Sequence, residues 1–119
     1  MSEDYYCDFI LNGKVTVDVV AETDRVLAFR HVFRTWEVHI VVIPKEHVRS
    51  LADVTDRDLL AELFQVVIEV IRTQRFTDSN YKVITNGGSF QSNQHLHVHI
   101  VSGKPLNPNQ EAAKGELAV

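Results

Sequence analysis

The chain has 119 residues, a length that accommodates one compact domain and little more. Hydrophobic residues make up 45% of the sequence and charged residues 24%, which is the balance of a globular rather than a disordered protein. The formal net charge of −4 excludes a general electrostatic attraction to nucleic acid or anionic lipid, so any bound phosphate must be held by local donors.

Cys7 is the only cysteine, so no internal disulfide bond can form. The sequence starts with acidic residues, and its apolar runs, such as residues 40–43, are far shorter than a membrane span. No signal peptide is visible. We therefore expect a cytoplasmic protein that binds neither membranes nor nucleic acid.

The first part of the chain predicts a short helix followed by three strands. Residues 5–12 mix aromatic and aliphatic side chains and stop at Gly13, which is typical of a short helix with a glycine at its C-terminal end. Valine-rich segments that alternate with polar residues predict the strands, and Pro44 ends the last of them. The three strands are expected at residues 16–22, 26–33 and 38–43.

A long helix is predicted at residues 56–76. Thr55 is a suitable N-cap residue, and Asp56 and Asp58 lie where the positive end of the helix dipole favours carboxylates. Because apolar residues recur at steps of three and four, they form one face that can cover a sheet. That face consists of Leu59, Leu60, Leu63, Phe64, Val67, Val70 and Ile71.

Two further strands complete the predicted fold, at residues 81–85 and 96–102, with a glycine-containing loop at residues 86–89 between them. The predicted class is therefore α+β, an antiparallel sheet of five strands with one long and one short helix. We expect one domain at residues 1–104 and a flexible C-terminal tail at residues 105–119.

Three histidines alternate with aliphatic residues in the last predicted strand. A period of two places their imidazoles on one face, which we expect to look toward solvent or a ligand, while the aliphatic face packs under the long helix. Same-face neighbours are about 7 Å apart, so adjacent imidazoles can share one anionic ligand. Imidazole suits nucleophilic and acid–base chemistry on a phosphoryl group. The alternating residues are His95, His97 and His99 with Leu96, Val98 and Ile100.

A metal site is the alternative interpretation, because His-x-His on a strand is also a chelating arrangement. A zinc hydrolase normally has carboxylate ligands nearby, and Asp and Glu are absent from residues 82–110. His39 or His47 could complete a ligand set. We expect no metal and no other cofactor, and we keep metal-dependent hydrolysis as the alternative.

Amide and hydroxyl side chains lie just before the three histidines. Asn86 ends the preceding strand, and Gln91 and Ser92 belong to a polar run that leads into His95. Such donors beside imidazoles are typical of a phosphoryl-binding site, although polar loops often contain the same residue types. Taken by themselves, the other three histidines (His31, His39 and His47) are typical of packing or surface residues.

The run from His95 to Val101 resembles the signature of the histidine triad superfamily, His-x-His-x-His followed by two hydrophobic positions. Further runs match that family in order and in most of the spacing from about Cys7 to Gly103, at residues 25–29, 42–48, 84–88 and 91–92. The chain is most similar to the branch of nucleoside phosphoramidases and histidine triad nucleotide-binding proteins. It is less similar to the galactose-1-phosphate uridylyltransferase branch, which has Gln at the position of His99.

The resemblance implies a hydrolase in which His97 attacks an α-phosphorus and forms a nucleotidyl-histidine that water then hydrolyses. It also implies that His99 contacts the phosphate and that the backbone carbonyl of His95 holds the His97 ring, with His39 beside it. The substrate-binding residues that it implies are Ser92, Asn86 and Gln91 around the phosphate and Phe29 and Ile10 around the nucleoside.

The resemblance further implies a HIT-like fold whose five-stranded sheets join into a ten-stranded sheet in a homodimer, across the long helix and a central strand. The expected ligand is a purine nucleoside monophosphate conjugate. Two alternatives stay open, a nucleotide-binding regulatory module with little turnover and a dinucleoside polyphosphate hydrolase.

The sequence departs from the family pattern at three places. His31 stands where the family has an acidic residue that grips the ribose hydroxyls; an imidazole can still hydrogen-bond a diol, without the charge assistance of a carboxylate. Many bacterial relatives carry Cys-x-x-Cys as half of a structural zinc site, but here Cys7 is followed by Ile10, so a site with four ligands is not expected. Residues 33–37 replace a segment that is usually rich in Pro and Ala.

Overall fold

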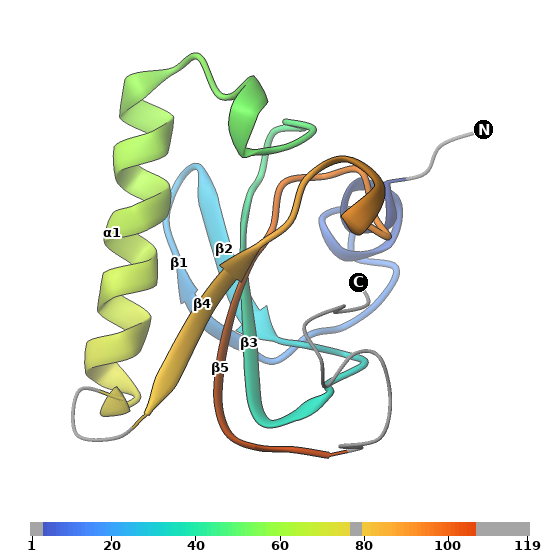
Figure 1. Cartoon of the computed structure of the whole chain (residues 1–119). Helices are drawn as coiled ribbons and strands as arrows, with labels where there is room; N and C mark the ends of the chain where they lie inside the picture. The colour runs from blue at the N-terminus through green and yellow to red at the C-terminus, as the bar shows by residue number, and fades with distance from the viewer. Residues whose placement is uncertain (1–3, 77–79, 107–119) are drawn as a thin grey trace.

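A computed structural model describes residues 4–76 and 80–106 of the chain. Its centre is one antiparallel sheet with the strand order β1-β2-β3-β5-β4, which confirms the predicted fold class (Figure 1). The strands are β1 (Val19–Glu22), β2 (Val26–Arg30), β3 (Trp36–Pro44), β4 (Tyr81–Thr85) and β5 (Val98–Pro105). In this order β1 and β4 are the two edges.

The helix α1 (Arg57–Thr73) covers one face of the sheet (Figure 1). Its apolar side packs on the side chains of β2, β3 and β5 that point the same way, and this layer is the main core. The N-cap is Asp56, whose side chain accepts hydrogen bonds from the backbone N–H groups of Asp58 and Leu59, so the prediction of Thr55 was wrong by one residue.

A short helix, η1 (Tyr6–Ile10), lies on the opposite face of the sheet (Figure 1). It is a single turn closed by a hydrogen bond from Leu11 N–H to the carbonyl of Tyr6, and the chain turns away at Gly13, which has a φ of +82°. The turn buries Tyr6 and Ile10 in a second apolar cluster with Leu27, Phe29, Val41 and Ile43. Both faces of the sheet are therefore covered.

The strand boundaries differ from the prediction most clearly near the histidines. β5 begins at Val98, so of the three alternating histidines only His99 lies in the strand. The backbone just before β5 forms a hydrogen bond outside the sheet, since the N–H of Leu96 donates to the carbonyl of Val48 at 2.6 Å. At the other end β5 continues to Pro105, inside the segment predicted as a tail; residues 107–119 lie outside the described part.

Short single turns occur at Leu51–Asp53 (η2) and Gly88–Phe90 (η4). Within residues 4–76 and 80–106, no helix combines the length and the apolar character that crossing a membrane requires.

Candidate active site

The three alternating histidines point to the face opposite α1, while Leu96, Val98 and Ile100 enter the core beneath the helix. The alternation therefore divides the side chains as expected. The imidazole face does not look toward solvent, however, since His95, His97 and His99 are all buried. The reason is η1, whose Tyr6 ring lies 5.2 Å from the His97 ring and 5.7 Å from the His95 ring, centroid to centroid.

His97 is held in one tautomer. Its Nδ1 lies 2.6 Å from the backbone carbonyl oxygen of His95, which can only accept, so Nδ1 carries the proton and Nε2 keeps its lone pair. The hydroxyl of Thr85 donates to the carbonyl of His97 and fixes the backbone at this point. Burial lowers the pKa of His97, although its hydrogen bond to His95 opposes the change. The result is a neutral imidazole with an oriented nucleophilic nitrogen.

A chain of hydrogen bonds fixes the tautomers of two further rings. The N–H of Thr35 donates to His39 Nδ1 at 3.2 Å, so His39 carries its proton on Nε2 and donates it to His99 Nδ1 at 2.8 Å. His99 then has its proton on Nε2, and that nitrogen is buried without a partner among the described residues. Burial lowers the pKa of His39 to about 3 and that of His99 well below its usual value, so both rings are neutral.

His31 adds a third ring to this group. It stacks on His39 with centroids 4.3 Å apart, and its Nδ1 accepts a hydrogen bond from the N–H of Phe33 at 2.9 Å. His31, His39 and His99 are close enough to share a metal ion. The backbone N–H groups on Nδ1 keep the protons of His31 and His39 on Nε2, however, and a ring nitrogen that binds a metal must be free of its proton. The hydrogen bonds therefore favour a row of N–H donors over a metal site.

A second cluster lies beside His95 and consists of Asp4, Cys7, His47 and His95, whose ligand atoms all lie within 4.8 Å of one another. His95 Nε2 donates to the carbonyl of Pro44 at 2.8 Å, which leaves Nδ1 facing Asp4 Oδ2 at 2.7 Å and Cys7 Sγ at 3.6 Å. His47 Nδ1 contacts the same carboxylate oxygen. Burial raises the pKa of Asp4, but the hydrogen bonds from Cys7, together with the contacts of His95 and His47, outweigh this effect and hold the pKa below the usual range.

This second cluster has the donors of a zinc site. One carboxylate oxygen, one sulfur and two imidazole nitrogens converge, and lone pairs brought this close repel unless a proton or a cation lies between them. The hydrogen bond from His95 Nε2 to a carbonyl is the support that metal-ligating histidines usually have. The second sulfur ligand of the family pattern would stand at Ile10, three residues after Cys7; here Asp4, three residues before Cys7, lies in the cluster instead. Ile10 packs in the apolar cluster beneath η1.

The residues predicted to bind substrate lie in several different parts of the structure. Phe29 lies with Ile10 in the apolar cluster that contacts the histidines through Tyr6. Ser92 is exposed, and Asn86 lines a surface pocket of about 380 Å³ with η2. Gln91 is turned inward, since its Nε2 donates to the carbonyls of Arg49 and Asn93 and so braces the loop.

Sequence reasoning missed Asp4, Tyr6, Thr35 and Thr85. A signal existed only for the first, because Asp4 and Cys7 repeat the three-residue spacing at which two metal ligands on one turn are commonly found.

Comparisons with known proteins identify the family of the chain. The family model described as HIT domain matches residues 12–106. A solved histidine triad protein from Clostridium difficile is 36% identical, with a TM-score of 0.76 over 92% of this chain and 97% of that one. The purine nucleoside phosphoramidase of Escherichia coli is 27% identical over 91% of this chain and 94% of its own length. A 14 kDa zinc-binding protein of Zea mays is 33% identical over 84% and 82%, respectively.

Proposed function

Since the chain belongs to the HIT family and has the fold of that family's hydrolases, we propose that it hydrolyses a nucleoside phosphoramidate or a related nucleoside-monophosphate conjugate at the α-phosphorus. One observation carries this proposal: the lone pair of His97 Nε2 is oriented by the His95 carbonyl, next to a buried N–H donor on His99. The two rings lie 4.8 Å apart at 83°. A nucleophile and an adjacent donor are what a displacement at phosphorus requires.

The reaction proceeds in two displacements. His97 Nε2 attacks the α-phosphorus, a phosphorus–nitrogen bond to the enzyme forms, and the bond to the leaving amine breaks as the amine takes up a proton from solvent. Water then attacks the same phosphorus, loses a proton to solvent, and releases the nucleoside monophosphate and the free imidazole. His99 Nε2–H donates to a phosphoryl oxygen in both steps, and Ser92 and Asn86 supply further donors from the preceding loop.

The nucleoside is bound by the apolar cluster of Phe29 and Ile10, which Tyr6 connects to the histidines. His31 contributes an imidazole to this wall in place of a carboxylate. The enzyme acts as a homodimer in the cytoplasm, and its substrate is a purine nucleoside monophosphate conjugate.

Substitution of the nucleophile tests the proposal. His97→Ala should lower kcat on a nucleoside phosphoramidate by roughly 10⁴-fold or more, because the covalent route is lost. In the wild type, rapid quenching and mass spectrometry should detect a nucleotidyl adduct on His97. The circular dichroism spectrum of His97→Ala serves as the folding control.

Three results would contradict parts of this scheme. Wild-type turnover by His97→Ala would remove the assigned nucleophile. Tight nucleotide binding by the wild type with no adduct and no turnover would favour a regulatory module. Turnover confined to dinucleoside polyphosphates would favour that hydrolase activity.

We also propose that Asp4, Cys7, His47 and His95 bind one zinc ion. Their fit to zinc supports this, as does the similarity to a relative named as a zinc-binding protein. Because the protein would fill all four positions, the ion would supply a structural cross-link between the N-terminal turn and the histidine segment. His95 would then be fixed at its ring by the ion and at its carbonyl by His97.

Elemental analysis tests the zinc proposal. The wild type, purified from zinc-containing medium, should hold about one zinc ion per chain, and a chelator should lower its Tm. Cys7→Ser and Asp4→Asn should each weaken zinc binding by at least roughly ten- to hundred-fold. Substitution of residues that only hydrogen-bond to metal ligands already causes a loss of this size, and these two residues are ligands themselves. Asp8→Asn, in the same turn but outside the cluster, is the matched control and should keep the ion. The proposal would be refuted if the purified wild type held no zinc and its Tm were the same with and without the chelator.

A further inference from the structure

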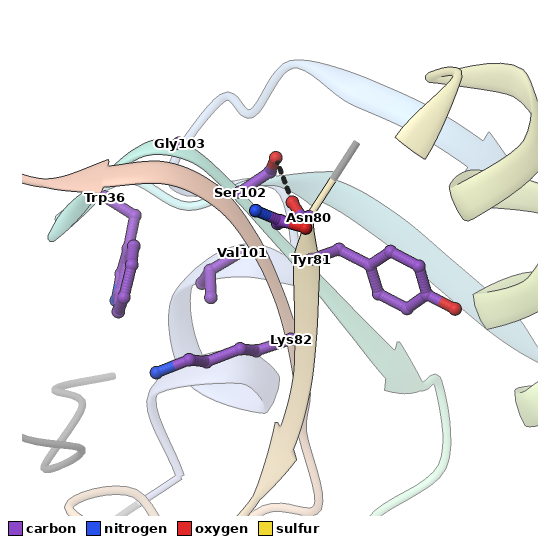
Figure 2. A pocket seen from close by; sticks show the side chains of 7 residues that line it. All are labelled: Trp36, Asn80, Tyr81, Lys82, Val101, Ser102 and Gly103. Carbon is purple, nitrogen blue, oxygen red and sulfur yellow. Dashed lines mark hydrogen bonds between the residues drawn. The ribbon is translucent and has the colours of Figure 1, made fainter. Parts of the chain in front are cut away.

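A pocket of about 320 Å³ lies between the start of β3, the start of β4 and the part of β5 that pairs with it (Figure 2). This volume is at the lower end of the range of small-molecule sites. Figure 2 shows Trp36, Val101 and Lys82 on one side of the sheet, with Lys82 extending toward the indole, while Tyr81 points away. The full lining is Trp36, Asn80, Tyr81, Lys82, Val101, Ser102 and Gly103.

The strand register places this pocket next to the catalytic rings. Val101 is the direct partner of His39 on β3 and of Lys82 on β4, so the three side chains share one face. His99 precedes Val101 by two residues on β5, and same-face neighbours on a strand are about 7 Å apart. The pocket therefore begins one row of side chains beyond the ring of His99.

The chemistry of the pocket is that of an apolar slot with one cation. Trp36 and Val101 are 7% and 1% exposed, respectively, and pack against each other. The Lys82 ammonium lies 5.1 Å from the centroid of the Trp36 ring. No carboxylate of residues 4–76 or 80–106 forms an ion pair with Lys82, so the charge is available to a ligand.

The proposed reaction decides which part of the substrate reaches this pocket. In a displacement at phosphorus the attacking and leaving atoms are roughly in line, so the leaving group points away from His97. Along β5 the direction away from His97 leads past His99 to Val101. The apolar cluster of Phe29 and Ile10 lies on the other side of the histidines, toward β2 and η1, and is assigned to the nucleoside.

We propose that the pocket of Trp36, Lys82 and Val101 receives the leaving group of the substrate and selects one that joins an apolar or planar body to a carboxylate. The body would lie on Trp36 and Val101, and the carboxylate would pair with Lys82. This inference rests on the proposed phosphoramidase reaction and adds the class of leaving group to it. Lys82 is thereby a specificity residue.

Two matched substrates test the proposal. Phosphoramidates of one nucleoside are made with phenylalanine and with phenylalanine amide as the leaving amine, which differ in charge but hardly in size. In the wild type kcat/KM is measured for both, and in Lys82→Gln the ratio of acid to amide should fall by about tenfold, the effect of losing one charge-assisted contact. Lys104→Gln, a neighbouring lysine on β5 outside the pocket, should leave the ratio unchanged.

The outcomes separate this inference from the function on which it depends. If the wild type turns over neither these substrates nor the unsubstituted phosphoramidate of the same nucleoside, the proposed function fails. If it turns over only the unsubstituted phosphoramidate, the function stands and the leaving-group pocket is refuted. If it turns over both and Lys82→Gln keeps the wild-type ratio, the function stands and the leaving-group pocket is refuted. Lys82 is exposed, so its replacement is compatible with folding, and Lys82→Arg should restore most of the ratio because the charge is retained.

Discussion

At the scale of single residues, the candidate site depends on imidazoles that stay neutral. Backbone groups set each tautomer: the His95 carbonyl for His97, and the N–H of Thr35 for His39. Burial then disfavours the protonated forms. Keeping these rings unprotonated lowers the free energy of unfolding at acidic pH, because the unfolded chain binds more protons than the folded chain does.

His39 illustrates the size of this cost. Its pKa is about 3 in the folded chain and near the ordinary value of 6.5 when unfolded, so the unfolded state binds more protons between these limits. Stability is therefore lost as the pH falls below 6.5. Between pH 7.5 and pH 5.5 this one ring should remove about 1.4 kcal/mol from the free energy of unfolding.

His39→Gln tests the sign and the size of the effect. Glutamine does not titrate, so the loss of stability between the two pH values should be smaller by about 1.4 kcal/mol in the variant. Urea unfolding at constant ionic strength measures both proteins. Identical pH dependences would show that His39 is not held neutral by the fold.

At the scale of elements, the strand β4 is paired with β5 on one side only and forms an edge of the sheet. α1 packs mainly over β1, β2, β3 and β5, and the residues of β4 that point to the same side stay largely exposed. Tyr81 and Val83 are 45% and 42% exposed, and Ile68 on α1 is 46% exposed. An unpaired edge beside an apolar surface invites pairing with a second strand. A second copy that pairs β4 with β4 would supply both the strand and the helix.

The proposed dimer can be broken at this edge. Val83→Lys should turn the wild-type dimer into a monomer at micromolar concentration, because two lysines would meet across the joined strands. Val19→Lys, on the opposite edge strand β1 and at least as exposed, is the matched control and should remain a dimer. Sedimentation equilibrium measures the masses, and a monomeric wild type would contradict the proposal.

At the scale of the whole molecule, the sequence predicted the features that depend on residues close together in the chain. The period of α1 and the alternation around His97 are set by side chains three, four or two residues apart, so they could be recognised in the sequence. The N-cap moved from Thr55 to Asp56 because either residue type can cap a helix, and the choice depends on the path of the preceding chain.

Contacts between distant segments had no such pattern. Asp4 meets His95 across 91 positions, and the covering of the histidines by Tyr6 depends on where η1 docks. The pocket of Trp36 and Lys82 arises only after β3, β5 and β4 are placed side by side. Polar and cation–aromatic contacts of this kind are set by the tertiary fold, so no regular spacing of residues in the sequence predicts them.

His95 links the cluster of Asp4, Cys7 and His47 to His97, because its ring contacts Asp4 and Cys7 while its backbone carbonyl binds the His97 ring. Under the proposed mechanism, selection on catalysis therefore extends to side chains that never contact the reacting phosphorus. A substitution at Asp4 or Cys7 would then alter how His97 is held, so these two positions and His47 are expected to change together when the lineage of this protein diverges.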